Sequence, residues 1–256
     1  NGAYGASLLE KAVIRKSTSL VKKLIDKGVE LNQANDRGST PLEIAKRLDA
    51  VEIANLLISN GADASKVRTF EMKGAYIGQD TPGIKPVIFA PNVISTEEYE
   101  FGSVFNKAAD EFYYGVNANG KEEIRYSKLT GNQWSKPVIL LSHDQYGYND
   151  PFLSPDEKRL YFISQRAIDG KGESKDYDIW YVEKEKDSWS APINAGPAIN
   201  SDRDEYYISF TNDGTMYFAS DKTIEGNPGE PNHDIYYSKF VDGEFQEAVV
   251  LGDSVN

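Results

Sequence analysis

The second part of the chain repeats one order of short apolar segments, and this repeat restricts the fold more than any other feature. One segment of the repeat occurs at 124–127, 179–182 and 235–238. Ten positions after the isoleucine that opens each of these segments stands a large aromatic residue: Trp134, Trp189 and Phe245. A chain with such a period builds one structural unit several times instead of a single continuous core.

Each repeat contains four strand-like segments. The segments at 124–127, 179–182 and 235–238 are the third of the four. The first segment of each repeat lies at 102–105, 151–154 and 208–211, and the second lies at 112–114, 160–162 and 216–218. Tyr, Phe, Ile and Val dominate the segments, and Gly, Asn, Asp and Pro fill the connections, which favours strands joined by tight turns. Four-stranded units at a fixed period predict the blades of a β-propeller.

Residues 1–68 differ in composition from the rest of the chain. They contain one of the 30 aromatic residues, Tyr4, and carry 11 Lys and Arg against 8 Asp and Glu, a net charge of +3. Residues 69–256 carry 17 Lys and Arg against 32 Asp and Glu, a net charge of −15. Because good helix formers dominate the first part, this change predicts two architectures joined near Arg68.

The first part repeats with a period of 33, which places Leu9 on Leu42 and Leu24 on Leu57. The matching apolar positions fall at helical spacing, so each unit is predicted to contain two short helices. Thr40 followed by a proline is a typical helix start, with the threonine as the cap.

Residues 38–42 and 56–63 resemble ankyrin repeats, and the resemblance extends over most of the first part. It departs from the family at Glu43, where histidine is usual, and at Leu8, which replaces a proline, so we expect a different hydrogen-bond network in the first turn. Ankyrin repeats bury their apolar faces only against neighbours, and two are few for stability. We therefore expect a further repeat before this sequence, or support from the next domain.

Residues 154–164, with 178–181 behind them, resemble the TolB-like, WD-repeat-like propeller repeat of bacteria. The pattern is clear in the second and third units and weaker in the first, where 106–109 replace the Ser-Pro-Asp type of turn. The segment from 76 to 91 resembles the lead-in to such propellers in bacterial proteins with exported or envelope locations. The resemblance covers about 70–256.

The segment 85–91 resembles the outer strand of a blade, although no other strand of that blade precedes it. In propellers, a lone outer strand at one end of the chain commonly completes the last blade and closes the ring. Three blades and one strand cannot close a ring that has typically four to eight blades. We therefore expect a fragment of a longer, six-bladed protein.

The predicted fold is multidomain, with an all-α ankyrin pair followed by all-β propeller blades in an incomplete ring. Residues 1–68 are assigned to about two ankyrin repeats, and 69–97 to a linker plus the closing strand. Residues 98–256 are assigned to three blades, truncated at the C-terminal end.

Composition excludes several classes of function. The net charge of −12 argues against binding nucleic acid through its phosphates. The chain has no cysteine, which excludes disulfides, thiolate zinc sites and a cysteine nucleophile. The longest aliphatic run, 138–141, is far shorter than a membrane span, so we expect no transmembrane segment.

Few residues in the sequence point to catalysis. There is no Gly-x-Ser-x-Gly elbow and no phosphate-binding loop, and we expect no cofactor. His143 and His233 fall in loops predicted to face one mouth of the propeller, where a metal or general-base role is conceivable. Asp202, Asp204 and Glu205 could bind calcium, but their spacing does not match an EF-hand. Solvated loop histidines and solvated acidic turns are the simpler interpretations.

The same mouth is predicted to carry the binding surface. Because the four strands of a blade are antiparallel, the loops that join the second strand to the third lie on the same face of the propeller as the loops that join the fourth strand to the first strand of the next blade. Two of these loops, 165–177 and 221–233, are long, and long loops on a rigid scaffold commonly bind partners. The predicted binding residues are Glu100, Tyr148, Glu205, Gln165, Arg166, Asp221 and Lys222. The simpler alternative is that Arg166 and Lys222 only pair with neighbouring carboxylates, which contributes little to stability.

Both resemblances imply a non-enzymatic interaction or scaffold protein of the bacterial envelope, with a protein or peptide as partner. The implied location is periplasmic or extracellular, with the cytoplasm as the alternative. The alternative function is a propeller that binds or degrades carbohydrate or peptide at the mouth of the ring. Fold-level analogy is a weak basis for choosing between them.

Overall fold

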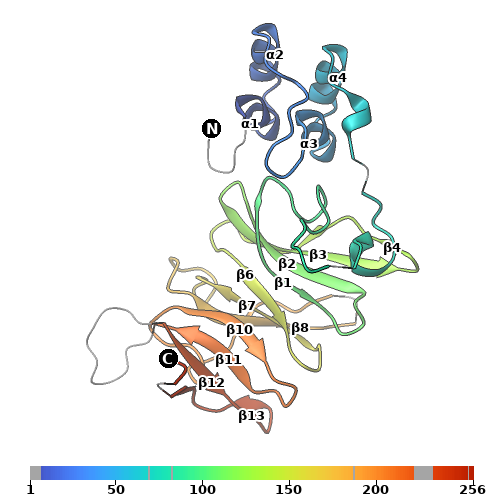
Figure 1. The fold of residues 1–256 in the computed structure, drawn as a ribbon. Helices are drawn as coiled ribbons and strands as arrows, with labels where there is room; N and C mark the ends of the chain where they lie inside the picture. The colour runs from blue at the N-terminus through green and yellow to red at the C-terminus, as the bar shows by residue number, and fades with distance from the viewer. Residues whose placement is uncertain (1–6, 69, 82, 187, 222–232, 253) are drawn as a thin grey trace. The chain divides into compact units, whose positions relative to one another are not determined.

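The structure is a computed structural model that describes residues 7–68, 70–81, 83–186, 188–221, 233–252 and 254–256 (Figure 1). The chain divides into two compact units, Asn1–Glu97 and Glu98–Asn256. Every α-helix of the described residues belongs to the first unit, and every β-strand to the second. The change in composition along the sequence is therefore matched by a change in secondary structure, with the segment after Arg68 belonging to the first unit.

Helices occur in the first unit where the repeat predicts them: α1 (Leu8–Ile14), α2 (Thr18–Asp26), α3 (Pro41–Arg47) and α4 (Val51–Ser59). The start of α3 follows the start of α1 by one full period of the repeat, and α4 follows α2 in the same way. Two short 3-10 helices come next, Ala64–Lys66 and Ala75–Gly78. The apolar faces of the α-helices share one core that includes Leu9, Leu42 and Leu57. In the described part of the chain, no helix has the length and apolar character that crossing a membrane requires.

Glutamate at position 43 closes the first turn of α3. Its carboxylate accepts a hydrogen bond from the backbone N–H of Thr40 at 2.8 Å, and the Thr40 hydroxyl accepts one from the N–H of Glu43 at 3.3 Å. Glu10 and Ser7 form the same reciprocal pair at the start of α1. Glu43 also accepts from the backbone N–H and the Nε of Arg68, at 2.7 and 2.9 Å, which neutralises this buried carboxylate. Glutamate at this position thus closes a capping box at the start of α3 and binds Arg68.

The described residues of the second unit form three larger antiparallel sheets, one for each predicted repeat, and one two-stranded hairpin. The first comprises β1 (Tyr99–Phe105), β2 (Glu111–Ala118), β3 (Lys121–Thr130), β4 (Gln133–Trp134) and β5 (Val138–Leu141). The second comprises β6 (Asn149–Leu153), β7 (Arg159–Ser164), β8 (Asp178–Glu183) and β9 (Ile193–Asn194). The third comprises β10 (Glu205–Phe210), β11 (Met216–Ser220), β12 (Asp234–Ser238) and β15 (Val249–Val250), beside a hairpin of β13 (Phe240–Val241) and β14 (Glu244–Phe245). Such four-stranded antiparallel sheets are of the kind that form propeller blades.

The fourth segment of each repeat is divided into two parts. Its aromatic residue folds back onto the end of the third strand in the pairs Leu129–Trp134, Lys184–Trp189 and Phe240–Phe245. Only the residues after this hairpin join the sheet as its outer strand, where β5 pairs with β3, β9 with β8 and β15 with β12.

The closing strand that the sequence predicts at 85–91 is not formed. In the described part of this region, the only strand-like pairing is a single bridge between Pro91 and Ser95. Val87 and Ile88 are 63% and 43% exposed. A strand needs a neighbouring edge to satisfy its backbone, and Pro86 and Pro91 lack the N–H that would pair with one. The residues at 85–91 therefore form no strand in this structure, and their role as the closing strand of a ring stays a prediction.

Consecutive sheets pack through aromatic side chains that recur in each repeat. Tyr113 and Tyr126 of the first sheet have ring centroids 5.0 Å apart, and Trp189 of the second sheet meets Tyr113 edge-on at 6.1 Å. One repeat later, Phe245 of the third sheet meets Tyr161 of the second in the same way at 6.2 Å. The aromatic residue at the fixed position of the repeat is therefore a packing residue between sheets in these two cases.

The first strand of each sheet carries a bulge at the same place. Gly102, Asp150 and Tyr207 have φ values of +42°, +46° and +56°, and the pairing register shifts across each of them. Gly102 also permits a close approach between sheets. A Cβ atom there would lie 2.6 Å from a carboxylate oxygen and 2.9 Å from the Cα of Asp150.

Replacing Gly102 with alanine should therefore destabilise the second unit by about 2–4 kcal/mol, because strain in the left-handed backbone adds to a clash with the next sheet. Gly120→Ala is the matched control, since Gly120 has φ +84° but no atom within 4 Å of its added Cβ. It should cost about 1 kcal/mol. Urea unfolding followed by near-UV circular dichroism measures both, because 29 of the 30 aromatic residues lie after position 68. Equal losses would contradict the close approach of the sheets.

Candidate functional site

Three of the predicted binding residues occupy equivalent positions in the three sheets. Glu100 lies in β1, Tyr148 lies just before β6, and Glu205 opens β10, each two positions before the bulge of its sheet. Their side chains differ in exposure, since Glu100 is half-buried and the other two are buried. The equivalence that the repeat predicts is present, but the three side chains do not form one exposed surface.

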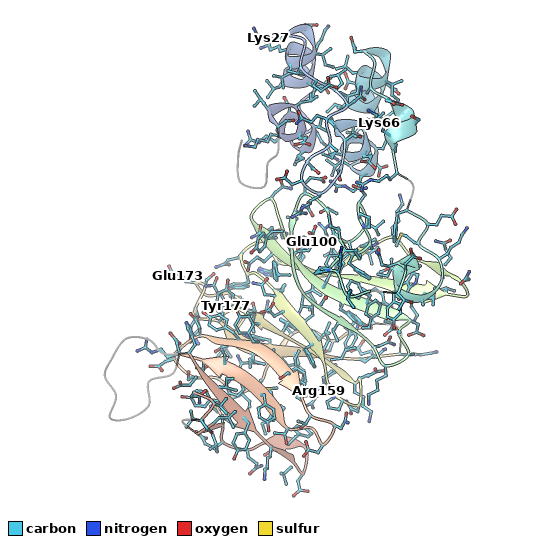
Figure 2. All side chains as sticks on the ribbon, in the orientation of Figure 1. Lys27, Lys66, Glu100, Arg159, Glu173 and Tyr177 are labelled. Carbon is cyan, nitrogen blue, oxygen red and sulfur yellow. The ribbon has the colours of Figure 1, made fainter. Side chains whose placement is uncertain are left out.

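Gln165, Arg166 and Asp221 lie at the same end of the sheets, because they follow β7 and β11. We call this end, with the loops that leave it, the mouth end. In Figure 2, Glu173 and Tyr177 mark the mouth end of the second sheet, and Arg159 marks its other end. The remaining predicted residue, Lys222, lies outside the described residues.

Tyr148 and Arg166 are in contact, but they pack against the second sheet and do not form an exposed binding surface. Tyr148 is 2% exposed and meets Phe162 edge-on at 5.3 Å. Its hydroxyl accepts a hydrogen bond from Arg166 at 3.3 Å. The Arg166 guanidinium lies 5.7 Å from the ring of Tyr146 and 5.8 Å from that of Trp180. These contacts hold the start of the loop against the sheet, so replacing Tyr148 with alanine tests the core and not a binding surface.

Glu205 is fully buried beneath two serines. It accepts hydrogen bonds from the hydroxyls of Ser201 and Ser220 at 2.6 and 3.0 Å. Burial raises the pKa of Glu205 to about 7 against the lowering effect of these serines. A carboxyl with a pKa near 7 has the property of a general acid or base, but with 0% exposure this one touches no solvent.

The other acidic residues at the mouth end accept hydrogen bonds from backbone N–H groups of neighbouring loops. Asp221 accepts from the backbone N–H of Asp204 at 3.0 Å, and Asp204 accepts from that of Tyr177 at 2.7 Å. Together with Asp202 and Glu205 they do not make a metal centre, because among the described residues no cluster of three His, Asp or Glu side chains suits a metal ion.

The two histidines have separate surroundings. His143 stacks on Tyr146 with ring centroids 4.7 Å apart, and its Nδ1 accepts a hydrogen bond from the N–H of Gln145. His233 meets Tyr206 edge-on at 6.0 Å. Each therefore packs on an aromatic ring, as a structural loop histidine does.

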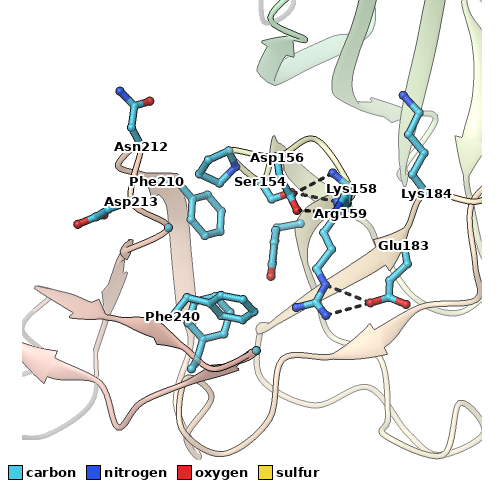
Figure 3. Close-up of a pocket in the computed structure, with 15 residues that line it drawn as sticks. Ser154, Asp156, Lys158, Arg159, Glu183, Lys184, Phe210, Asn212, Asp213 and Phe240 are labelled. Atoms are coloured by element: carbon cyan, nitrogen blue, oxygen red, sulfur yellow. Dashed lines mark hydrogen bonds and ion pairs between the residues drawn. The ribbon is translucent and has the colours of Figure 1, made fainter.

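A more open cavity lies at the opposite end of the sheets, which the sequence interpretation did not consider. It has a volume of about 560 Å³ and lies between the second and third sheets (Figure 3). We call it the aromatic cleft. Its walls include four aromatic residues: Tyr161, Phe210, Phe240 and Phe245. Its charged residues balance, three acidic against three basic: Asp156, Glu183, Asp213, Lys158, Arg159 and Lys184.

Arg159 and Glu183 form the polar wall of the aromatic cleft. The Nε and Nη2 atoms of Arg159 lie 3.1 and 3.0 Å from one carboxylate oxygen of Glu183. The guanidinium lies over the ring of Tyr181 at 4.5 Å and near that of Phe240 at 5.6 Å. Because Arg159 and Glu183 both belong to the second sheet, this ion pair does not cross the cleft.

The equivalent cavity between the first and second sheets has a volume of about 500 Å³ and different chemistry. We call it the charged cleft. Glu111 holds its centre, accepting from Lys128 of its own sheet at 3.0 Å and from Lys184 of the next sheet at 2.9 Å. Tyr113 donates to the same carboxylate at 2.9 Å. Burial raises the pKa of Glu111, but these three donors outweigh it and lower the pKa to about 2.

The strand pairing aligns the two clefts residue by residue. Glu111 pairs with Lys128 in the first sheet, as Arg159 pairs with Glu183 in the second. Lys184 pairs with Trp189, as Phe240 pairs with Phe245 one repeat later. Arg159 therefore stands in the place of Glu111, and Phe240 in the place of Lys184. In the aromatic cleft, the ion pair that crosses the charged cleft is replaced by the contact of Arg159 with the Phe240 ring at 5.6 Å.

No protein-family model matches this chain, and no curated protein matches it. Similar solved structures include a TolB candidate from Agrobacterium tumefaciens, with a TM-score of 0.44 and 18% identity over 61% of this chain and 50% of that chain. TolB from Acinetobacter baumannii has a TM-score of 0.41 and 18% identity, over 60% of this chain and 33% of that one. A puromycin-hydrolyzing peptidase from Mycobacterium tuberculosis has a TM-score of 0.42 and 12% identity, over 58% and 22%. The chain thus spans half or less of the length of each, and the blade assignment rests on the repeated sheets themselves.

The raised pKa of Glu205 predicts a specific dependence of stability on pH. The folded protein holds this proton more tightly than the unfolded chain, whose pKa is near the usual 4.5. The stabilisation is complete below pH 4.5 and is lost as the pH rises through about 7. Glu205→Gln should therefore flatten the fall in stability between these pH values. An unchanged slope, measured by urea unfolding at several pH values, would show that Glu205 is not the titrating group.

Glu111→Gln is the contrasting variant, because the pKa of Glu111 is lowered from 4.5 to about 2. Its ionised form stabilises the fold above pH 4.5, and this contribution is lost as the pH falls towards 2. The variant should be less stable than the parent at neutral pH, and its free energy of unfolding should fall less between pH 4.5 and 2. The fall in stability between pH 4.5 and 7 that Glu205 causes should be unchanged. The same unfolding series measures both effects.

Proposed function

We propose that this chain is a non-enzymatic interaction module, in which an ankyrin-like helical unit precedes TolB-like propeller blades and the partner is a protein or peptide. The two helix pairs, one repeat apart and capped by Ser7 and Thr40, support the ankyrin-like assignment. The turn at 154–157 and the four-stranded sheets support the TolB-like assignment.

The observation that carries the proposal is the aromatic cleft. It is preformed, lies in the volume range of ligand-binding cavities, and combines four aromatic residues with six charged residues whose charges balance. Aromatic residues are enriched at protein interfaces, where they supply most of the binding energy. The carboxyl group with the pKa best suited to catalysis, Glu205, lies buried at the other end of the sheets.

The charge of the chain indicates the character of the partner. Residues 69–256 carry a net charge of −15, whereas the charges lining the aromatic cleft sum to zero. A partner with a basic surface would be steered to this part of the chain by long-range attraction, which weakens as salt is added. An envelope location, periplasmic or extracellular, is the part of the proposal that rests on the resemblance of the sequence to TolB-like repeats.

Peptide selection on the immobilised full chain tests the proposal. Peptides selected from a random displayed library should bind with dissociation constants of about 1–100 μM, and more weakly at high salt. Peptide, ester and glycoside substrates should not be turned over. Turnover of any of these substrates, or binding of oligosaccharides and no peptides, would favour the alternative of a carbohydrate- or peptide-processing propeller.

A further inference from the structure

The two clefts between sheets allow a comparison within one molecule. They occupy equivalent positions in the repeat and have similar volumes, about 500 and 560 Å³. In the charged cleft, Lys184 of one sheet binds Glu111 of the other, so a ligand would have to displace an ion pair. In the aromatic cleft, the residue in the place of Lys184 is Phe240, which is 37% exposed. Among the described residues that line the aromatic cleft, no ion pair joins the second sheet to the third, so an entering ligand displaces none.

The walls of the aromatic cleft select for an aromatic ring. Phe240 and Phe245 meet at 4.9 Å, and Phe210 lies 5.0 Å from Tyr161, so rings surround the space. The guanidinium of Arg159, held by Glu183 and lying over the ring of Tyr181 at 4.5 Å, places a cation beside these rings, which favours the face of an entering aromatic ring. An ionic side chain would gain little here, because the lining has no net charge and Arg159 is already paired.

The repeat also explains why the aromatic cleft has room for a ring. Phe245 stands where the charged cleft has Trp189, so an indole is replaced by a smaller ring. We infer that the aromatic cleft binds an uncharged aromatic side chain of a protein or peptide partner, flanked in that partner by basic residues. This inference rests on the proposed function and adds the chemistry of the partner. The basic flanks follow from the net charge of −15 over residues 69–256.

Three short peptides test this chemistry on the full chain: acetyl-Lys-Trp-Lys-amide, acetyl-Lys-Ala-Lys-amide and acetyl-Glu-Trp-Glu-amide. Titrations followed by NMR chemical shifts of the protein give both the affinity and the location. The Lys-Trp-Lys peptide should bind at least about tenfold more tightly than either of the others, with shifts centred on Arg159, Phe240 and Phe245. Equal binding of the alanine peptide would overturn the role of the ring, and equal binding of the Glu peptide would overturn the role of the basic flanks.

Two substitutions block the aromatic cleft by introducing the residues that occupy the equivalent positions of the charged cleft. Phe245→Trp places the larger ring in the cleft, and Phe240→Lys introduces the residue of the charged cleft at an exposed position. Each should weaken binding of the Lys-Trp-Lys peptide by about tenfold or more. Trp189→Phe, the reverse change in the charged cleft, is the matched control and should leave binding unchanged. Thermal unfolding by near-UV circular dichroism checks that each variant is folded.

The outcomes separate this inference from the proposed function. Loss of binding in both blocking variants but not in the control supports the aromatic cleft. Unchanged binding in folded Phe240→Lys overturns it, even if library peptides bind elsewhere on the chain and the proposed function stands. Shifts in the cleft on addition of an oligosaccharide such as maltotriose, with none from the Lys-Trp-Lys peptide, would overturn both.

Discussion

An aromatic side chain from each following sheet rests on a tyrosine of the sheet before it, and the architecture of the second unit depends on this contact. Trp189 meets Tyr113 at 6.1 Å, and one repeat later Phe245 meets Tyr161 at 6.2 Å. Such edge-to-face pairs add about 0.5–1.5 kcal/mol each beyond the apolar area they bury. Because the contact recurs at one position of the repeat, it sets the spacing between sheets and leaves a cleft beside it each time.

The two clefts differ in where their ion pairs lie. Glu111 accepts hydrogen bonds from Lys128, Lys184 and the Tyr113 hydroxyl, so the first and second sheets are joined by an ion network around one buried carboxylate. Removing either lysine leaves the buried carboxylate of Glu111 with one charged partner fewer, which destabilises the fold because a buried charge needs its partners. Between the second and third sheets the ion pair stays within one sheet. The second unit thus has one cleft that an ion pair closes and one cleft whose aromatic walls are open to a ligand.

The sequence predicted the elements that depend on local pattern, and it failed where tertiary contacts decide. The period of the first part placed the four helices, and two of the three aromatic residues spaced ten after each isoleucine, Trp189 and Phe245, pack between sheets as predicted. The strand expected at 85–91 has the right composition but no partner edge, which no local pattern reveals. Tyr148 and Glu205 were placed correctly in the repeat, yet Phe162 and Ser201 bury them. The bulges at Asp150 and Tyr207 carry no glycine to signal them. The aromatic cleft joins Arg159 and Phe240, which lie in different repeats and whose contact only the stacking of sheets creates.

A crystal structure of the full chain with a bound, library-selected peptide tests the central claim most directly, which is that binding takes place between the second and third sheets. The account predicts an aromatic ring of the peptide in the aromatic cleft, against the rings of Phe240 and Phe245 and beside the guanidinium of Arg159, with the ion pair of Glu111 and Lys184 unchanged. A peptide seated instead at the mouth end, beside Arg166 and Asp221, would contradict it and would return the binding surface to the residues that the sequence first suggested.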